Sequence, residues 1–257
     1  MGLFFSRCKR RGIENHPGMG YVNHMNKSTR SRLTEKQLAV FAGNTLFDKI
    51  ARAVCRAGTL PGKELFEAWE VARRVRRKYR GGKVVDLACG HGLLAHIMLL
   101  LDDSSAEALA VDLDFTENTN RLSQIIIDRW PRLKNRIYYL NSRVEDIDLN
   151  PDDIAVSVHA CGQLTDTIIE SAVNAGARLA VLPCCHDTKV GDLGGLGGWV
   201  DGPLAIDLTR AAMLRAKGYC VITRTIPEEI TPKNRLLMAH PKMNNPAASD
   251  GVSNRKF

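Results

Sequence analysis

The sequence predicts an α/β fold, a Rossmann-like, doubly wound and mostly parallel sheet of seven strands, preceded by a small helical N-terminal extension. Three observations lead to this prediction. From residue 83 onward, short apolar runs alternate with stretches of helical periodicity, as in parallel strands joined by crossover helices. A turn containing Gly90 and Gly92 follows the first apolar run. The 257 residues are 44% hydrophobic and 25% charged, which excludes a fibre or a wholly disordered chain.

The first 80 residues show helical rather than strand periodicity. Residues 1–32 are basic with little apolar pattern, and we expect a flexible basic tail there. Residues 33–80 are predicted to form a helical, basic extension, with one helix over 33–55 that Thr34 could cap and a second over 63–79. Breaks are expected at Pro61-Gly62 and at Gly81-Gly82.

Residues 81–242 carry the alternating pattern. Strands are predicted at 83–87, 108–113, 137–140, 154–159, 178–183, 219–223 and 235–240. Helices are predicted at 93–101, 116–130, 165–175 and 204–217. A glycine-rich loop at 191–202 is a candidate lid, in which Trp199 is either a stacking platform for a base or a buried packing residue. Residues 243–257, rich in Asn, Pro, Ala and Ser, are expected to form a disordered tail.

Positive charge is concentrated at the front of the chain. Residues 1–80 hold 18 Lys and Arg against 6 Asp and Glu, whereas residues 81–257 hold 18 against 22. This split suggests a surface for a polyanion beside a separate core, with Arg73, Arg76, Arg77 and Arg80 of the second helix as candidate contacts. The alternative is that these basic helix faces are simply solvated.

The seven cysteines are odd in number, and no two of them form a C-x-x-C pair. This pattern suggests neither a secreted disulfide framework nor a zinc ribbon. We therefore expect a reducing compartment, the cytoplasm. No run of eighteen apolar residues occurs, so no membrane partner is expected.

The glycine turn has the features of a nucleoside-binding loop. Gly90 and Gly92 let backbone N–H groups approach a ligand closely, and the N-terminus of the following helix favours an anionic group. Asp112, 20 residues after Gly92, ends the second strand, where a carboxylate can accept both ribose hydroxyls. These features fit any adenosine cofactor, and they make Ala88 and Leu113 further candidate contacts.

Asp86, four residues before Gly90, separates two kinds of cofactor. A dinucleotide loop tolerates Ala95 in its last glycine position, so the glycines alone leave NAD as an alternative. An acid at residue 86 repels a pyrophosphate but can hold the cationic methionine end of another cofactor. The V-x-D-x-x-x-G-x-G pattern resembles motif I of class I S-adenosylmethionine-dependent methyltransferases. The predicted binding residues for S-adenosyl-L-methionine are Asp86, Ala88, Gly90, Gly92, Asp112 and Leu113.

Histidines and cysteines end two further strands that are neighbours in the methyltransferase strand order. The sequences are His159-Ala-Cys161-Gly and Pro-Cys184-Cys185-His186. His159 or His186 could act as acid or base near neutral pH, the thiols could bind zinc, or all could pack. Because adjacent cysteines do not easily face one ion, we predict no metal. The five residues are our candidates for catalysis and the acceptor pocket.

These motifs, with Thr165-Asp166 and Gly176-Ala177, resemble the methyltransferase domain family that includes the eukaryotic tRNA ribose 2′-O-methyltransferase and the glutathione-S-transferase C-terminal-domain-containing proteins. The resemblance covers residues 66–241, but the zinc-finger segments of the tRNA enzyme are absent from this sequence. It implies a methyltransferase domain over 81–242 that acts on RNA, with tRNA as one substrate. The alternatives are a protein or small-molecule methyltransferase and a non-catalytic binding module.

Three further polar residues have predicted positions. Asp166 is expected to cap the helix after the fourth strand rather than to take part in catalysis. Lys233 and Arg235 are candidates for phosphate contacts at the rim of the site.

Overall fold

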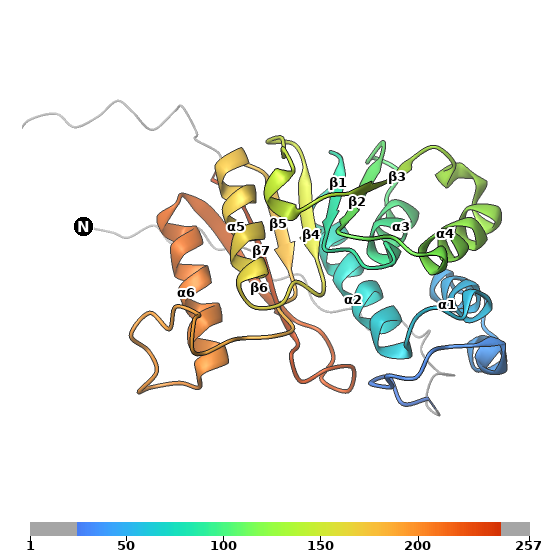
Figure 1. The fold of residues 1–257 in the computed structure, drawn as a ribbon, viewed down its shortest axis with the longest axis horizontal. Helices are drawn as coiled ribbons and strands as arrows, with labels where there is room; N and C mark the ends of the chain where they lie inside the picture. Colours follow the sequence, from blue (N-terminus) through green and yellow to red (C-terminus); the bar gives the residue numbers. More distant parts are fainter. Residues whose placement is uncertain (1–24, 243–257) are drawn as a thin grey trace, which may run out of the picture.

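A computed structural model describes residues 25–242 (Figure 1). Its centre is a seven-stranded sheet in the order β3-β2-β1-β4-β5-β7-β6. β7 runs antiparallel to both of its neighbours, β5 and β6, and the other pairs are parallel, so the predicted fold is confirmed. The strands are β1 (Val84–Leu87), β2 (Ala108–Asp112), β3 (Ile137–Asn141), β4 (Ile154–Ser157), β5 (Arg178–Val181), β6 (Tyr219–Thr225) and β7 (Arg235–Pro241).

Helices cover both faces of the sheet, and successive residues of β1 show which face is which. Val84 packs in a core formed with the N-terminal helices, whereas Val85 packs in a second core on the opposite face. The first layer contains α1 (Leu46–Ala57), α2 (Gly62–Lys78), α3 (Leu93–Leu101) and α4 (Glu117–Arg129), and the second contains α5 (Gln163–Ala175) and α6 (Gly202–Ala216). No helix of the described residues is long and apolar enough to cross a membrane.

The prediction of one continuous helix over 33–55 is wrong in its middle. The structure has a 3-10 helix, η1 (Glu35–Phe41), and then α1 (Leu46–Ala57). Thr45 starts the second helix, because its hydroxyl accepts the Asp48 N–H at 3.1 Å and its own N–H donates to the Asp48 carboxylate. At the break, a Cβ on residue 43 would lie 2.3 Å from Asp48 Oδ2, so a residue larger than Gly43 would displace the Asp48 side chain from its cap.

The N-terminal extension shares its core with the sheet. Phe41, Leu65 and Val71 are fully buried in the same cluster as Val84. Part of the predicted tail also has a fixed place, since the Lys27 ammonium lies 3.1 Å from Glu229 and the Thr29 carbonyl accepts the N–H of residue 63. The rest of the tail at 1–24, and the predicted tail at 243–257, lie outside the described residues.

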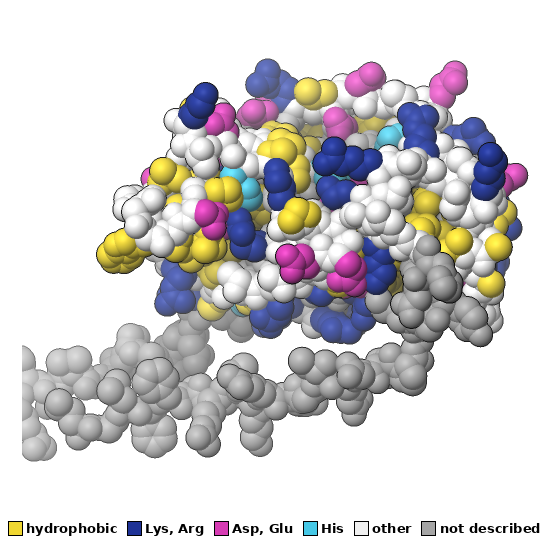
Figure 2. All heavy atoms as spheres, turned by 90° about the horizontal axis from the view of Figure 1, so that it is seen from below, with side chains coloured by type: hydrophobic (Ala, Val, Ile, Leu, Met, Phe, Trp, Pro, Cys, Tyr) yellow, Lys and Arg dark blue, Asp and Glu magenta, His cyan; other side chains and the backbone are white. Residues whose placement is uncertain are grey.

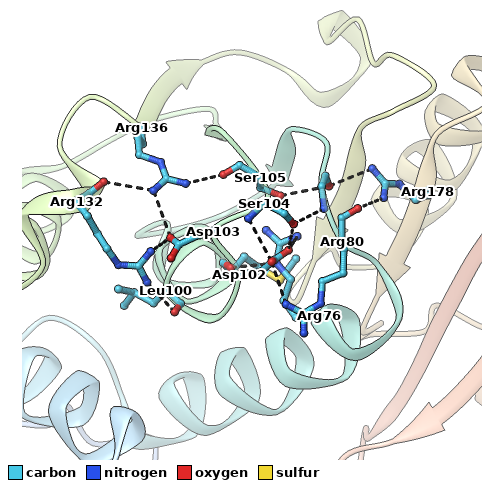
Figure 3. Close-up of polar contacts among 12 residues, drawn as sticks. Arg76, Arg80, Leu100, Asp102, Asp103, Ser104, Ser105, Arg132, Arg136 and Arg178 are labelled. Carbon is cyan, nitrogen blue, oxygen red and sulfur yellow. Dashed lines mark hydrogen bonds and ion pairs between the residues drawn. The ribbon is translucent and has the colours of Figure 1, made fainter.

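Asp102 forms ion pairs with Arg76 and Arg80, two of the arginines predicted to bind a polyanion (Figure 3). Arg76 Nη1 lies 3.3 Å from one carboxylate oxygen of Asp102, and Arg80 Nη1 lies 2.9 Å from the other. Arg76 is 2% exposed and also donates from Nε to the Met98 carbonyl. The prediction that Arg76 contacts a polyanion is therefore wrong, because α3 covers it. Arg80 keeps most of its side chain exposed, but its charge is paired.

Candidate active site

A cavity of about 390 Å³ opens at the carboxyl ends of β1, β2 and β4. This is the edge at which open α/β sheets bind ligands, and it faces the viewer in Figure 2, where Lys, Arg and His side chains lie among apolar ones. The lining residues come from the glycine turn, α2, α3 and the end of β4; they are Leu60, Glu64, Ala68, Asp86, Ala88, Cys89, Gly90, His91, Leu93, Leu94, Asp112, Val158 and His159.

The turn between β1 and α3 has the backbone conformation that its glycines allow. Gly90 and Gly92 have φ angles of 57° and 70°, and Ala88, which is not a glycine, has 54°. A Cβ at Gly90 would meet no described atom within 4 Å, so the space beside it is open. A Cβ at Gly92 would lie 2.9 Å from the Tyr139 ring. Gly90 therefore presents bare backbone to the cavity, whereas Gly92 packs against Tyr139 and is not among the described residues that line the cavity.

Asp86 lies beneath this turn with 1% of its surface exposed. Its Oδ2 accepts the Ala95 N–H at 3.1 Å and so ties β1 to the first turn of α3. No Lys or Arg of the described chain pairs with the carboxylate. Burial, opposed by the Ala95 hydrogen bond and assisted by the charge of Asp112, raises the pKa of Asp86 to about 8. A cation in the cavity would relieve this cost.

Asp112 holds the turn from the end of β2. Its Oδ2 accepts the Gly90 N–H at 2.7 Å, and its Oδ1 accepts the Leu113 N–H at 2.8 Å. Each carboxylate oxygen retains a second lone pair for a ligand hydroxyl. Leu113 is 70% exposed and is not among the described residues that line the cavity.

One wall of the cavity comes from residues that sequence reasoning missed. Leu60 precedes α2, while Glu64 and Ala68 lie one turn apart on it. Burial raises the pKa of Glu64, although neighbouring Lys63 lowers it. The helical periodicity predicts that Ala68 lies on the apolar face of its helix. It does not reveal that this face of α2 forms a wall of the cavity.

His159 forms an unexpected pair with Glu67 of α2. Its Nε2 lies 3.5 Å from Glu67 Oε2, an oxygen that is buried and has no hydrogen bond within the described structure. Burial and the charge of Lys63 lower the pKa of His159 to about 4. Burial raises the pKa of Glu67, which Lys63 offsets only in part. Burial therefore opposes the titration near neutral pH that the sequence led us to expect of His159.

His186 is directed to a different part of the protein. Its Nε2 lies 2.7 Å from Asp207 Oδ1 of α6, its side chain is buried, and it is not among the described cavity residues. Arg235 donates to the other oxygen of Asp207 at 2.6 Å, so its charge is already paired. Burial opposes ionisation of Asp207, but the bonds from His186 and Arg235 lower its pKa overall.

Asp166 is not a helix cap. It lies inside α5, whose N-cap is Gly162, and its two carboxylate oxygens accept from Arg210 Nε and Nη2 at 2.6 and 2.9 Å. This bidentate pair joins α5 to α6. The prediction failed because the partner, Arg210, lies 44 residues further along the chain.

The three predicted cysteines lie together. Cys161 Sγ is 2.9 Å from Cys184 Sγ, and Cys184 Sγ is 3.8 Å from Cys185 Sγ. The argument that adjacent cysteines do not face one point is therefore wrong here, because all three sulfurs lie within 4.8 Å of one another. Lys233 extends to the cluster, with its Nζ 3.8 Å from Cys185 Sγ.

Trp199 is 87% exposed on the glycine-rich loop. The alternative that it packs in a core is thereby excluded, and its ring remains free to stack.

Comparison with known proteins identifies the domain. Residues 64–190 match a family model described as "Methyltransferase domain". This part of the chain is similar to a methyltransferase domain. The predicted enzyme class, an S-adenosylmethionine-dependent methyltransferase, is confirmed, and S-adenosylmethionine is the methyl donor. The family match begins within α2, inside the segment predicted as an extension. No curated protein matches the sequence.

Solved structures of methyltransferases resemble this chain at low identity. An rRNA methylase from Streptococcus thermophilus is 16% identical, with 68% of this chain and 92% of that chain covered and a TM-score of 0.44. The tRNA methyltransferase TrmK of B. subtilis is 15% identical, with coverages of 67% and 66% and a TM-score of 0.46. A putative O-methyltransferase from Nostoc punctiforme is 12% identical, with coverages of 80% and 66% and a TM-score of 0.46. None of these similarities indicates what this chain methylates.

The cavity fits the donor on its own geometry. Open space beside Gly90 leaves room for a ligand against the backbone, and the buried Asp86 carboxyl has no positive partner among the described residues. Asp112 places carboxylate oxygens at the adjoining strand end. Asp86 could hold the cationic methionine end, and Asp112 could hold the ribose.

Proposed function

We propose that this methyltransferase acts on RNA, and that tRNA is the first species to test. The observation that carries the proposal is a basic groove of about 810 Å³ along the C-terminal half of α2 and the neighbouring strand β6. The motif resemblance to tRNA ribose 2′-O-methyltransferases supports tRNA in particular.

The basic groove is defined by five cations: Arg73, Arg74, Arg77, Lys78 and Arg224. Glu70 is the acid among its lining residues, and it pairs with the first two arginines. The other three cations are exposed and form no ion pair within the described structure. An uncompensated cluster of this kind attracts phosphates. Of the four arginines named from the sequence, Arg73 and Arg77 line this groove, whereas Arg76 and Arg80 do not. The unpredicted lining cations are Arg74, Lys78 and Arg224.

The donor and acceptor sites share helix α2 in this proposal. Asp86, Ala88, Gly90, Gly92 and Asp112 hold S-adenosylmethionine, which supplies an electrophilic methyl group when bound. His159 lies at the cavity wall and accepts the proton that the methylated oxygen or nitrogen loses. Glu67 positions the imidazole from behind. The acceptor side of the cavity is bordered by Cys161, Cys184 and Cys185. The contact between His186 and Asp207 holds the segment after β5 in place.

The proposed function is tested by transfer of tritium from labelled S-adenosylmethionine to total RNA of the source cell. We expect label in RNA with the unaltered protein and none with Asp86→Ala, which removes the donor contact. Size fractionation of labelled RNA shows whether tRNA carries it. If the protein binds the donor but labels protein or small molecules instead of RNA, the proposal is wrong.

Replacing Arg77, Lys78 and Arg224 by alanine should weaken RNA binding while leaving donor affinity unchanged. Each lost phosphate contact lowers the slope of log affinity against log salt by about 0.7 to 0.9, so the triple variant should lose about two units of slope. Fluorescence anisotropy at several salt concentrations measures this. A matched control replaces three exposed cations outside the groove, Lys134, Arg215 and Lys217. Equal losses in both variants would contradict a specific groove.

A further inference from the structure

Cys161, Cys184 and Cys185 form a cluster whose positions the backbone fixes. The cluster follows β4 and β5, which run side by side in parallel register. Beyond the strand ends, Cys161 and Cys185 still form an isolated parallel bridge, and the Gly162 N–H donates to the Cys185 carbonyl at 3.1 Å. Three thiols therefore converge from two adjoining segments rather than from one mobile loop.

The spacing of the sulfurs matches shared coordination better than packing. The Cys161–Cys184 separation of 2.9 Å is close for two unbonded sulfurs, but it is longer than the about 2.05 Å of a disulfide. A tetrahedral zinc ion with bonds of about 2.3 Å holds its sulfurs about 3.8 Å apart. Cys184 and Cys185 already have this separation. All three sulfurs lie within 4.8 Å of one another, which is close to the spacing that shared coordination needs.

The surroundings favour a soft divalent ion. The group contains thiols and no carboxylate, which disfavours Mg²⁺ and Ca²⁺ and favours zinc. Three thiolates on Zn²⁺ leave a net charge of −1, and the Lys233 ammonium 3.8 Å from Cys185 compensates it. Cys161 and Cys185 are exposed, so an ion has a path of entry. His186 is excluded as a ligand through Nε2, which Asp207 holds.

We propose that Cys161, Cys184 and Cys185 bind a zinc ion as thiolates. Binding releases the three thiol protons to solvent and leaves the fourth tetrahedral position to water or a substrate atom. Because Cys161 is two residues beyond the cavity-lining His159, the ion adjoins the acceptor side of the donor cavity. The zinc site goes beyond the proposed function and does not depend on what the acceptor is.

Metal content tests the site directly. The full chain is purified without chelator from zinc-supplemented cells and analysed by mass spectrometry of the metal. We expect about one zinc ion per chain, and a loss of most of it in the double variant Cys161→Ser/Cys184→Ser. The Cys220→Ser variant, altered on β6 away from the cluster, should keep its zinc. Zinc-free unaltered protein, or equal zinc in both variants, would overturn the proposal.

Two measurements on the unaltered protein test the site even if the double variant fails to fold. Cobalt(II) added to the metal-free chain should give thiolate-to-cobalt charge-transfer bands and intense visible bands of tetrahedral cobalt. An alkylating reagent should modify the three cluster cysteines only after a chelator is added, and peptide mapping locates the modified residues. Absent cobalt bands, or a Cys161–Cys184 disulfide found by non-reducing peptide mapping, would show that the cluster does not hold metal.

Discussion

Replacing Asp86 by asparagine should lower the affinity for S-adenosylmethionine at least about a hundredfold, since a buried charge pair whose one member is lost costs about 3–5 kcal/mol. Asparagine keeps an oxygen for the Ala95 N–H, which ties β1 to α3, and it removes a carboxyl whose burial opposes ionisation. The fold should therefore survive. Isothermal titration calorimetry measures the affinity, and circular dichroism checks the fold.

The matched control for this variant is Asp114→Asn, which removes an exposed carboxylate shortly after β2. Its affinity for the donor should stay within about twofold of the unaltered protein, because an exposed charge is screened by solvent. Unchanged affinity in Asp86→Asn would remove Asp86 from the donor site.

The same residue gives donor binding a pH dependence. Burial raises the pKa of Asp86 to about 8 in the free protein, so most of it is protonated at neutral pH. A bound cation favours the ionised form, and donor binding must then release a proton. Affinity should rise about tenfold per pH unit from pH 6 toward 8 and level off above it. In Asp86→Asn this slope should be absent. The neutral carboxyl also stabilises the fold below pH 4, a contribution that is lost as pH rises through 8.

Replacing Asp102 by alanine should lower the free energy of unfolding by about 3–5 kcal/mol, because the Arg76 charge remains buried without its partner. The side chains of Arg76 and Asp102 are 3% and 6% exposed, and two nitrogens of Arg76 have no hydrogen bond within the described structure. Urea denaturation measures the change. Asp102 also bonds to Ser104, so α2 and the turn after α3 would loosen together.

Asp103 provides the control one residue away. It pairs with Arg132 and Arg136, but its side chain is 71% exposed, so Asp103→Ala should cost less than about 1 kcal/mol. Similar losses in the two variants would contradict a special role for the buried pair. Burial opposes the charge of Asp102, but bonds from Ser104 and Arg80 lower its pKa overall. Its stabilising contribution is therefore present above pH 4 and is lost as pH falls below that value.

The fold was predictable because the changes in hydrophobic periodicity along this sequence coincide with its chain-breaking residues. All seven strands and the helix Leu93–Leu101 follow directly from apolar runs and glycines. The break between η1 and α1 was missed because apolar spacing continues across it, and only the Thr45–Asp48 capping box starts a new helix there. Arg76 was misplaced because the pattern of α2 does not reveal that α3 covers one of its polar positions.

The site was predictable where one short segment supplies it. The glycine turn is a single run of residues, so Asp86 and Gly90 were predicted together, and both line the cavity. Glu67 was not recognised as a partner of His159, since the two come from elements 92 residues apart in the chain. Neither the Asp207 bond that turns His186 away nor the convergence of three thiols follows from spacing alone.

Helix α2 has one end in the donor cavity and the other in the basic groove. Glu64 and Ala68 face the cavity, and Arg73 and Arg77 face the groove. A helix moves as one rigid body, so a polyanion that displaces the basic end also displaces the cavity wall. Occupancy of the two sites would then be thermodynamically linked, with each ligand altering the affinity for the other by the same factor.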